Sequence, residues 1–142
     1  MILDCSKYVG PCRCGREHTL ETKKVVVEYN ALDKFDQYMD EVGLSGKRAV
    51  IYDTNTYNLP TLRHVRADQE IVLNAEGLHS EKGMIEDMMR QLDHPDVIDA
   101  VGSGTIMDFG RYPAYHLGIP FVAVPTLASS DGFTANICSI II

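Results

Sequence analysis

The sequence predicts an α/β fold: a mainly parallel, Rossmann-like sheet with helices on both faces. Short β-branched or apolar runs alternate with segments of helical spacing, in the order β-α-β-α-β-α-β-α-β. One of these runs, 97–101, is followed by the small-residue turn Gly102-Ser103-Gly104-Thr105 and then by a helical segment. A glycine loop between a strand and a helix is typical of a phosphate-binding site, because the first N–H groups of the helix point at the anion.

The composition is that of one soluble globular domain. The 142 residues suffice for a buried core, and the contents of 45% hydrophobic and 23% charged residues are ordinary. A net charge of −7 without a basic run argues against nucleic-acid binding. No apolar stretch approaches the roughly 20 residues that cross a bilayer, and no secretory signal segment begins the chain. We therefore expect a cytoplasmic protein that binds neither nucleic acid nor a membrane.

In the first half, β-branched or apolar runs predict three strands, at 24–28, 48–53 and 70–73. Asn30 is predicted to cap a helix over 31–42 that ends at Gly43. A second helix is predicted over 54–65, although Pro60 would place its true start near Leu59.

In the second half, Ser80 is predicted to cap a helix that His94-Pro95 stops, with an apolar face that includes two core methionines. The last predicted elements are a strand at 97–101, a helix at 106–117 and a strand at 121–124. The chain then ends in an apolar run, 135–142, which would leave a bare strand edge at a terminus. We therefore expect residues 1–142 to be the N-terminal domain of a longer protein.

Three of the four cysteines lie close to a histidine near the start of the chain. Cys12, Cys14 and His18 have side chains that bind zinc well, and Cys5 could complete a tetrahedron. The alternative is a reduced loop whose turns are set by glycine and proline, because Cys-x-Cys is not the usual zinc-knuckle spacing and no second half-site follows.

Two loops are candidates for a nucleotide site. The general Gly-x-Gly-x-x-Gly signature fails, because Met107 stands where its third glycine would be. Asp53 ends a predicted strand and could hold ribose hydroxyls, or it could only cap the next helix. The glycine loop itself could equally be a tight turn without a ligand.

The glycine loop and the loop after 121–124 together resemble a known family. The stretches Gly102-Ser103-Gly104-Thr105-Ile106-Met107-Asp108-Phe109-Gly110-Arg111-Tyr112 and Pro125-Thr126-Leu127-Ala128-Ser129-Ser130-Asp131-Gly132-Phe133-Thr134 resemble the bacterial NAD(P)-dependent branch of the glycerol-1-phosphate dehydrogenases. The Cys-x-Cys-Gly-x-x-His start and Asp53-x-Asn-Thr are also similar to that branch. This family belongs with glycerol dehydrogenase, the iron-containing alcohol dehydrogenases and dehydroquinate synthase. The resemblance covers only its N-terminal domain, so the helical C-terminal domain is absent from this chain.

The resemblance implies roles for individual residues. Gly102, Ser103, Gly104, Thr105 and Ile106 would bind the pyrophosphate of NAD or NADP. Asp53 would bind the adenosine ribose, and Thr126 and Ser129 would line the nicotinamide. Asp131 would bind the substrate, or else serve as a turn residue, and Asp108 would tie the glycine loop to its helix. The family usually has Asn in place of Met107 and Ser in place of Ala135, so we expect either reduced activity or a subfamily with altered cofactor affinity.

The resemblance also implies an oxidoreductase that interconverts dihydroxyacetone phosphate and sn-glycerol 1-phosphate. A divalent metal (zinc, nickel or iron) would polarise the substrate. Its ligands would lie outside this chain, whose scattered histidines include no His-x-x-x-His pair, so no catalytic or metal-binding residue is assigned and the fragment is expected to be inactive. A small phosphorylated polyol and further copies of the full-length enzyme, in a homodimer or larger assembly, are the expected partners. The alternatives are another polyol dehydrogenase, a dehydroquinate synthase-like enzyme and a non-catalytic nucleotide-binding module.

Overall fold

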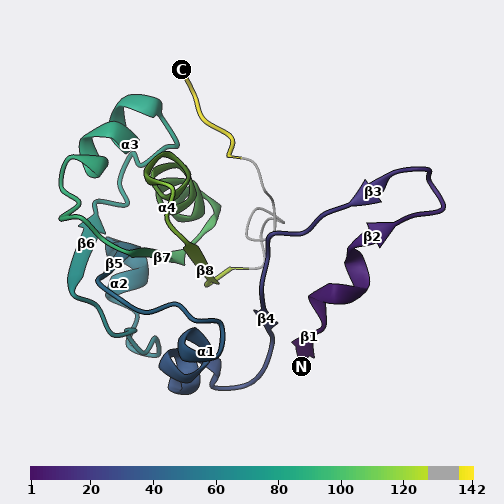
Figure 1. Ribbon diagram of the computed structural model, residues 1–142. Helices are drawn as coiled ribbons and strands as arrows, with labels where there is room; N and C mark the ends of the chain where they lie inside the picture. The colour runs from purple at the N-terminus through teal and green to yellow at the C-terminus, as the bar shows by residue number, and fades with distance from the viewer. Residues whose placement is uncertain (128–137) are drawn as a thin grey trace. The chain divides into compact units, whose positions relative to one another are not determined.

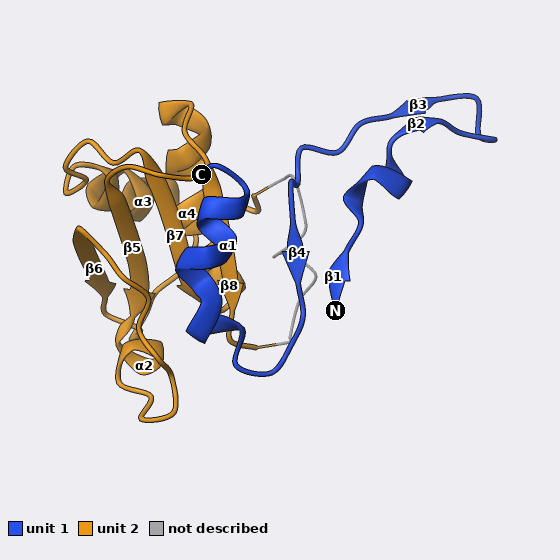
Figure 2. Ribbon diagram, turned by 60° about the horizontal axis from the view of Figure 1, so that its bottom comes forward, with its two compact units in different colours: residues 1–43 blue, residues 44–142 orange. Residues whose placement is uncertain are grey.

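The computed structural model describes residues 1–127 and 138–142. The chain divides into two compact units, Met1–Gly43 and Leu44–Ile142, which Figure 2 distinguishes by colour. No helix of the described residues is both long and apolar enough to cross a membrane. Ser129, Asp131 and Ala135 lie outside the described residues.

The larger unit is built on a parallel four-stranded sheet (Figure 1). Its strands are β5 (Arg48–Asp53), β6 (Gln69–Leu73), β7 (Val97–Gly102) and β8 (Phe121–Pro125). Their order is β6-β5-β7-β8, and every neighbouring pair is parallel. The central strands β5 and β7 are almost wholly buried, as expected of apolar runs in a covered parallel sheet. The predicted parallel α/β fold and these four strands are confirmed to within one residue.

Two helices, α3 (Lys82–Met89) and α4 (Gly104–Leu117), pack on one face of this sheet (Figure 1). Alternate residues of the strands point into the resulting core, and the helices add long apolar side chains. The buried core cluster comprises Ala49, Ile51, Ile71, Ile85, Met88, Ile98, Ala100, Ile106, Met107, Phe109 and Ala114. Met88 and Met107 are therefore core residues.

Gly110 lets α4 approach the sheet closely. A Cβ atom at this position would lie 2.6 Å from Cε2 of Phe121 on β8 and 2.8 Å from Cβ of Ala100 on β7. Both distances are shorter than carbon–carbon contact. The backbone of α4 thus rests almost directly on the strands, and the helix ends where Gly118 adopts a left-handed conformation (φ 67°).

The opposite face of the sheet carries polar groups. The buried Tyr52 packs edge-on against Tyr57, with ring centroids 5.3 Å apart, and its hydroxyl accepts the Val65 N–H at 3.3 Å. Asp99, with no exposed surface, lies 3.4 Å from Nε of Arg48. The connection between β5 and β6 therefore covers part of this face.

The smaller unit consists of short elements. Its strands are β1 (Ile2–Leu3), β2 (Gly10–Pro11), β3 (Glu17–His18) and β4 (Val25–Val26), and its helices are η1 (Cys5–Tyr8), η2 (Ala31–Lys34) and α1 (Phe35–Glu41). β1 pairs with β4 and β2 pairs with β3, both antiparallel.

The prediction of a fifth parallel strand at 24–28 is wrong, because Val25–Val26 pairs antiparallel with Ile2–Leu3. Asn30 does not cap a helix through its side chain but adopts a left-handed conformation (φ 56°). Gly43 does follow the end of α1, with φ 71°.

Two predictions in the larger unit are also wrong. The helix predicted over 54–65 is a single turn, α2 (Thr54–Tyr57), and no helix begins at Leu59. Ser80 does not cap α3, whose N-cap is Glu81. The Ser80 hydroxyl instead donates to Oδ2 of Asp108 on α4, at 2.9 Å.

Candidate functional site

The strand order creates a divergence point at the carboxyl edge of the sheet. From β5 the chain passes to β6 on one side, and from β7 it passes to β8 on the other. The connections that leave the neighbours β5 and β7 therefore separate, and ligands of open α/β sheets bind in the crevice that forms there. Asp53 ends β5 and Gly102 ends β7, so both candidate loops begin at this point.

The turn after β7 leaves the start of α4 open to a ligand. Ser103 is the N-cap residue, with extended backbone (φ −81°, ψ −178°), and its side chain makes no capping hydrogen bond. The N–H groups of the first turn, at Gly104, Thr105 and Ile106, have no partner inside an α-helix. The Ile106 side chain is fully buried, so only its backbone can contribute to binding. An uncapped helix start behind small residues suits a phosphate group.

Gly102 has a packing role that the sequence did not reveal. A Cβ atom there would lie 2.8 Å from Cγ1 and 2.9 Å from Cβ of Ile106. Because Ile106 fills the core beneath the loop, a side chain at Gly102 would push the first turn of α4 away from β7. Gly102 thus fixes the position of the N–H groups that follow it.

Thr126 connects the second candidate loop to the first. Its N–H donates to the carbonyl oxygen of Gly102 at 3.0 Å, one step beyond the paired residues Gly102 and Pro125. The start of the loop after β8 therefore lies beside the glycine loop.

Asp53 is nearly buried, with 7% of its surface exposed, and it caps α2. Its Oδ1 accepts the Thr56 N–H at 2.7 Å. Thr54, the next residue, accepts the Ala75 N–H through Oγ1 at 3.1 Å, which ties together the connections that follow β5 and β6. The capping alternative is therefore realised. A ribose would have to share this carboxylate with the Thr56 N–H.

The contacts of Asp108 include Ser80 and Arg111, neither of which lies in the glycine loop. Its Oδ2 accepts the Ser80 hydroxyl, and its Oδ1 lies 4.0 Å from NH1 of Arg111. The expected tie between Asp108 and the glycine loop is not present among the described residues, and Asp108 instead joins α4 to the segment before α3. Sequence reasoning treated Ser80 as a helix cap, and so missed this contact.

The positively charged residues just before and at the start of β5 are engaged elsewhere. Lys47 forms an ion pair with Asp93, and Arg48 forms one with the buried Asp99. Arg48 is at the start of the strand that Asp53 ends. Neither cation is therefore placed to neutralise a phosphate at Asp53.

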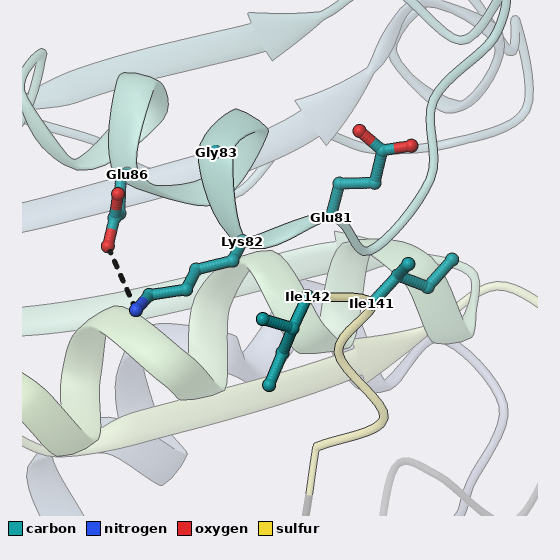
Figure 3. Close-up of a pocket in the computed structure, with 6 residues that line it drawn as sticks. All are labelled: Glu81, Lys82, Gly83, Glu86, Ile141 and Ile142. Carbon is teal, nitrogen blue, oxygen red and sulfur yellow. Dashed lines mark ion pairs between the residues drawn. The ribbon is translucent and has the colours of Figure 1, made fainter.

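A shallow pocket of about 430 Å³ lies at the start of α3 (Figure 3). It is lined by Glu81, Lys82, Gly83, Glu86, Ile141 and Ile142. Lys82 is directed toward Glu86, and the Lys82 N–H donates to the Ile141 carbonyl oxygen at 3.0 Å. No residue of the glycine loop contributes to the pocket, so we assign it no part in nucleotide binding.

The structure brings three of the four predicted zinc ligands together. The ligand atoms of Cys12, Cys14 and His18 all lie within 4.8 Å of one another. Cys5 is not part of the group, and its thiol contacts the carbonyl oxygen of Leu3 at 3.9 Å. This is the only cluster of three or more potential metal ligands among the described residues, and all its members belong to the unit of residues 1–43.

Comparison with known proteins shows which family the chain resembles. A family model described as iron-containing alcohol dehydrogenase matches residues 26–142. The glycerol-1-phosphate dehydrogenase (NAD(P)+) of Halalkalibacterium halodurans is 31% identical over 95% of this chain and 37% of its own length. That of Bacillus licheniformis is 32% identical over 95% of this chain and 36% of its own length. The chain thus spans a little over a third of the length of these curated relatives.

A solved structure is similar as well. The probable glycerol dehydrogenase from Sinorhizobium meliloti superposes with a TM-score of 0.57 and 25% sequence identity. The match covers 72% of this chain and 28% of that one.

Proposed function

The chain belongs to the iron-containing alcohol dehydrogenase family, and from this membership we propose that residues 1–142 are the NAD(P)-binding domain of a glycerol-1-phosphate dehydrogenase. The whole protein would interconvert dihydroxyacetone phosphate and sn-glycerol 1-phosphate. The observation that carries this proposal is the hydrogen bond from the Thr126 N–H to the Gly102 carbonyl oxygen, which sets the start of the loop after β8 beside the glycine loop.

The residues present fit a dinucleotide. Gly102, Ser103 and Gly104 put no bulky side chain in front of α4, and its first N–H groups would hold the pyrophosphate, together with Thr105 and Ile106. Asp53, at the end of the neighbouring strand, would accept hydrogen bonds from the adenosine ribose. When bound, the nicotinamide supplies or accepts the hydride. The chain's own task is to hold and orient that ring, for which we propose Thr126 and Ser129.

Substrate and metal binding require residues other than those that hold the cofactor. Asp131 is proposed to bind the glycerol phosphate. A divalent ion (zinc, nickel or iron) would polarise the reacting oxygen, with ligands outside this chain. We also propose that the full-length enzyme is a homodimer or larger homo-oligomer.

Titration of the full-length protein with NADH tests the cofactor site. Gly104→Val puts a branched side chain where the backbone would meet phosphate, and it is expected to abolish binding while the protein stays folded. Gly83→Val is the matched control, because Gly83 also lies in the first turn of a helix and a Cβ there meets nothing within 4 Å. Equal NADH affinity of the two variants would show that the loop is only a turn.

A second candidate function, glycerol dehydrogenase, is favoured by the structural similarity to the probable glycerol dehydrogenase from Sinorhizobium meliloti. Rates with dihydroxyacetone and with its phosphate decide between the two, because only the first proposal requires the phosphate. Asp131→Asn should leave cofactor affinity intact and lower kcat/KM for the preferred substrate by roughly 10- to 1,000-fold. Cofactor binding without turnover of either substrate would point to a non-catalytic module.

A further inference from the structure

The cluster of Cys12, Cys14 and His18 is built by a tight hairpin. β2 and β3 pair Gly10 with His18, and the Cys12 N–H closes the loop on the Arg16 carbonyl oxygen at 2.9 Å. A second hydrogen bond, from the Gly15 N–H to the Cys12 carbonyl oxygen at 2.9 Å, forms the turn, with Gly15 at φ 81°. This turn brings Sγ of Cys14 to 3.2 Å from Nε2 of His18.

Burial of side chains contributes little to the stability of this hairpin. None of the residues 1–24, all of which the structure describes, is buried. An isolated two-stranded hairpin is marginally stable in water, and segments this small usually need a disulfide or a metal. All four cysteines are free thiols, so a disulfide does not supply the missing stability.

The spacing of the three ligand atoms fits zinc. With Zn–S bonds of about 2.3 Å and Zn–N bonds of about 2.0 Å, tetrahedral geometry separates two sulfurs by about 3.8 Å and a sulfur from a nitrogen by about 3.5 Å. The observed separations, 3.2 Å for Cys14 and His18 and none above 4.8 Å in the group, require only small side-chain rotations. Two thiolates and a neutral imidazole also balance the charge of Zn²⁺, and such soft donors select it over magnesium or calcium.

We propose that Cys12, Cys14 and His18 bind one zinc ion that closes the hairpin of residues 10–18, with the fourth position taken by water. Cys5 is not a ligand.

Cobalt substitution tests this site in the full-length protein, reduced and stripped of metal. Sulfur-to-cobalt charge-transfer absorption arises only from thiolate-bound cobalt, so an ion held by oxygen and nitrogen ligands elsewhere in the enzyme does not contribute. We expect one thiolate-bound cobalt ion per chain, with two Co–S bonds. Added zinc should displace this ion. Cys12→Ser and Cys14→Ser should each halve the band and weaken affinity about 100-fold or more. His18→Ala should keep the band while weakening affinity.

Cys5→Ser and Cys138→Ser are the matched controls and should change neither the band nor the affinity. A loss with Cys5→Ser equal to that with Cys14→Ser would overturn the three-ligand assignment. Absence of the charge-transfer band in the reduced protein, or a Cys12–Cys14 disulfide in its place, would overturn the site. As a readout of the hairpin itself, zinc should slow hydrogen exchange of the Cys12 and Gly15 amides. Unchanged exchange would refute the proposed closure. NADH binding by these variants should be unaffected, so this test and the cofactor test can fail independently.

Discussion

Replacing Gly110 by alanine should move α4 off the sheet. The new Cβ would lie 2.6 Å from the Phe121 ring and 2.8 Å from Cβ of Ala100, about 1 Å inside van der Waals contact. The Phe121 ring can rotate, because it is only partly buried, but Ala100 belongs to a fully buried central strand and cannot yield. The helix must therefore shift.

The net effect combines two opposing terms. Overpacking a core costs about 1–3 kcal/mol. Alanine in a helix interior is favoured over glycine by about 1 kcal/mol. Gly110→Ala should therefore destabilise the protein by between zero and about 2 kcal/mol. Gly83→Ala, on α3 with nothing within 4 Å, should stabilise it by up to about 1 kcal/mol.

Urea unfolding of the two variants measures this difference, which should be about 1–3 kcal/mol and leave the m-value unchanged. NADH affinity should fall in Gly110→Ala only, because the first turn of α4 moves with the helix. If Gly110→Ala stabilises the protein as much as Gly83→Ala does, α4 is not held as closely to the sheet as described.

Three further predictions concern single side chains. A carboxylate that binds ribose hydroxyls repels the extra phosphate of NADPH, so Asp53 should make the enzyme prefer NADH. Asp53→Asn keeps a capping side chain and removes its charge, so NADH affinity should fall about 10-fold and the preference for NADH over NADPH should narrow, with unchanged melting temperature. Equal kinetics of the wild-type enzyme with NADH and NADPH would contradict the ribose assignment. Burial, followed by nearby Glu70 and Asp99, raises the pKa of Tyr52 from 10.0 to about 12. Between pH 10 and 12 the Tyr52 phenol is therefore protonated in the folded state and ionised in the unfolded chain. Its contribution to the free energy of unfolding is complete below pH 10 and is lost as the pH rises toward 12. If the free energy of unfolding of Tyr52→Phe falls equally steeply over this pH range, the loss belongs to another group. Ser80→Ala leaves Asp108 without its hydroxyl donor and should cost about 1 kcal/mol in urea unfolding with no change in NADH affinity; no loss of stability would show that the 2.9 Å contact contributes nothing.

The sequence predicted the parts of the fold that depend on local pattern. The runs ending at Asp53 and Gly102 are buried strands because continuous β-branched and apolar residues suit a sheet covered on both faces. Pattern could not give strand partners. Val25–Val26 has the side chains of a strand, but its pairing with Ile2–Leu3 depends on residues far away in the sequence.

Polar residues misled the prediction where tertiary contacts competed with local ones. Ser80 suits a helix cap, but its hydroxyl reaches Asp108, 28 positions later. The sequence indicated the glycine loop of the site but not the tertiary contacts that position it. Gly104 reads as a loop glycine from its neighbours, whereas the close approach at Gly110 appears only once β7 and β8 lie beneath it.

The pairing of β5 with β7 has a kinetic consequence. At the start of these strands the Lys47 N–H donates a hydrogen bond to the Asp96 carboxylate. The two residues are 49 positions apart, and β6 and α3 lie between them in the chain. Contacts so distant in sequence raise the contact order and slow folding, because loop closure precedes the gain from pairing. Before β7 has been synthesised, the nascent chain can form the β5–β6 pair. The turn at Gly102 cannot yet form, because Gly102 is the last residue of β7. The crevice between Asp53 and Gly102 would therefore be completed late in synthesis, together with the hydrophobic layer beneath it, to which α4 contributes Ile106.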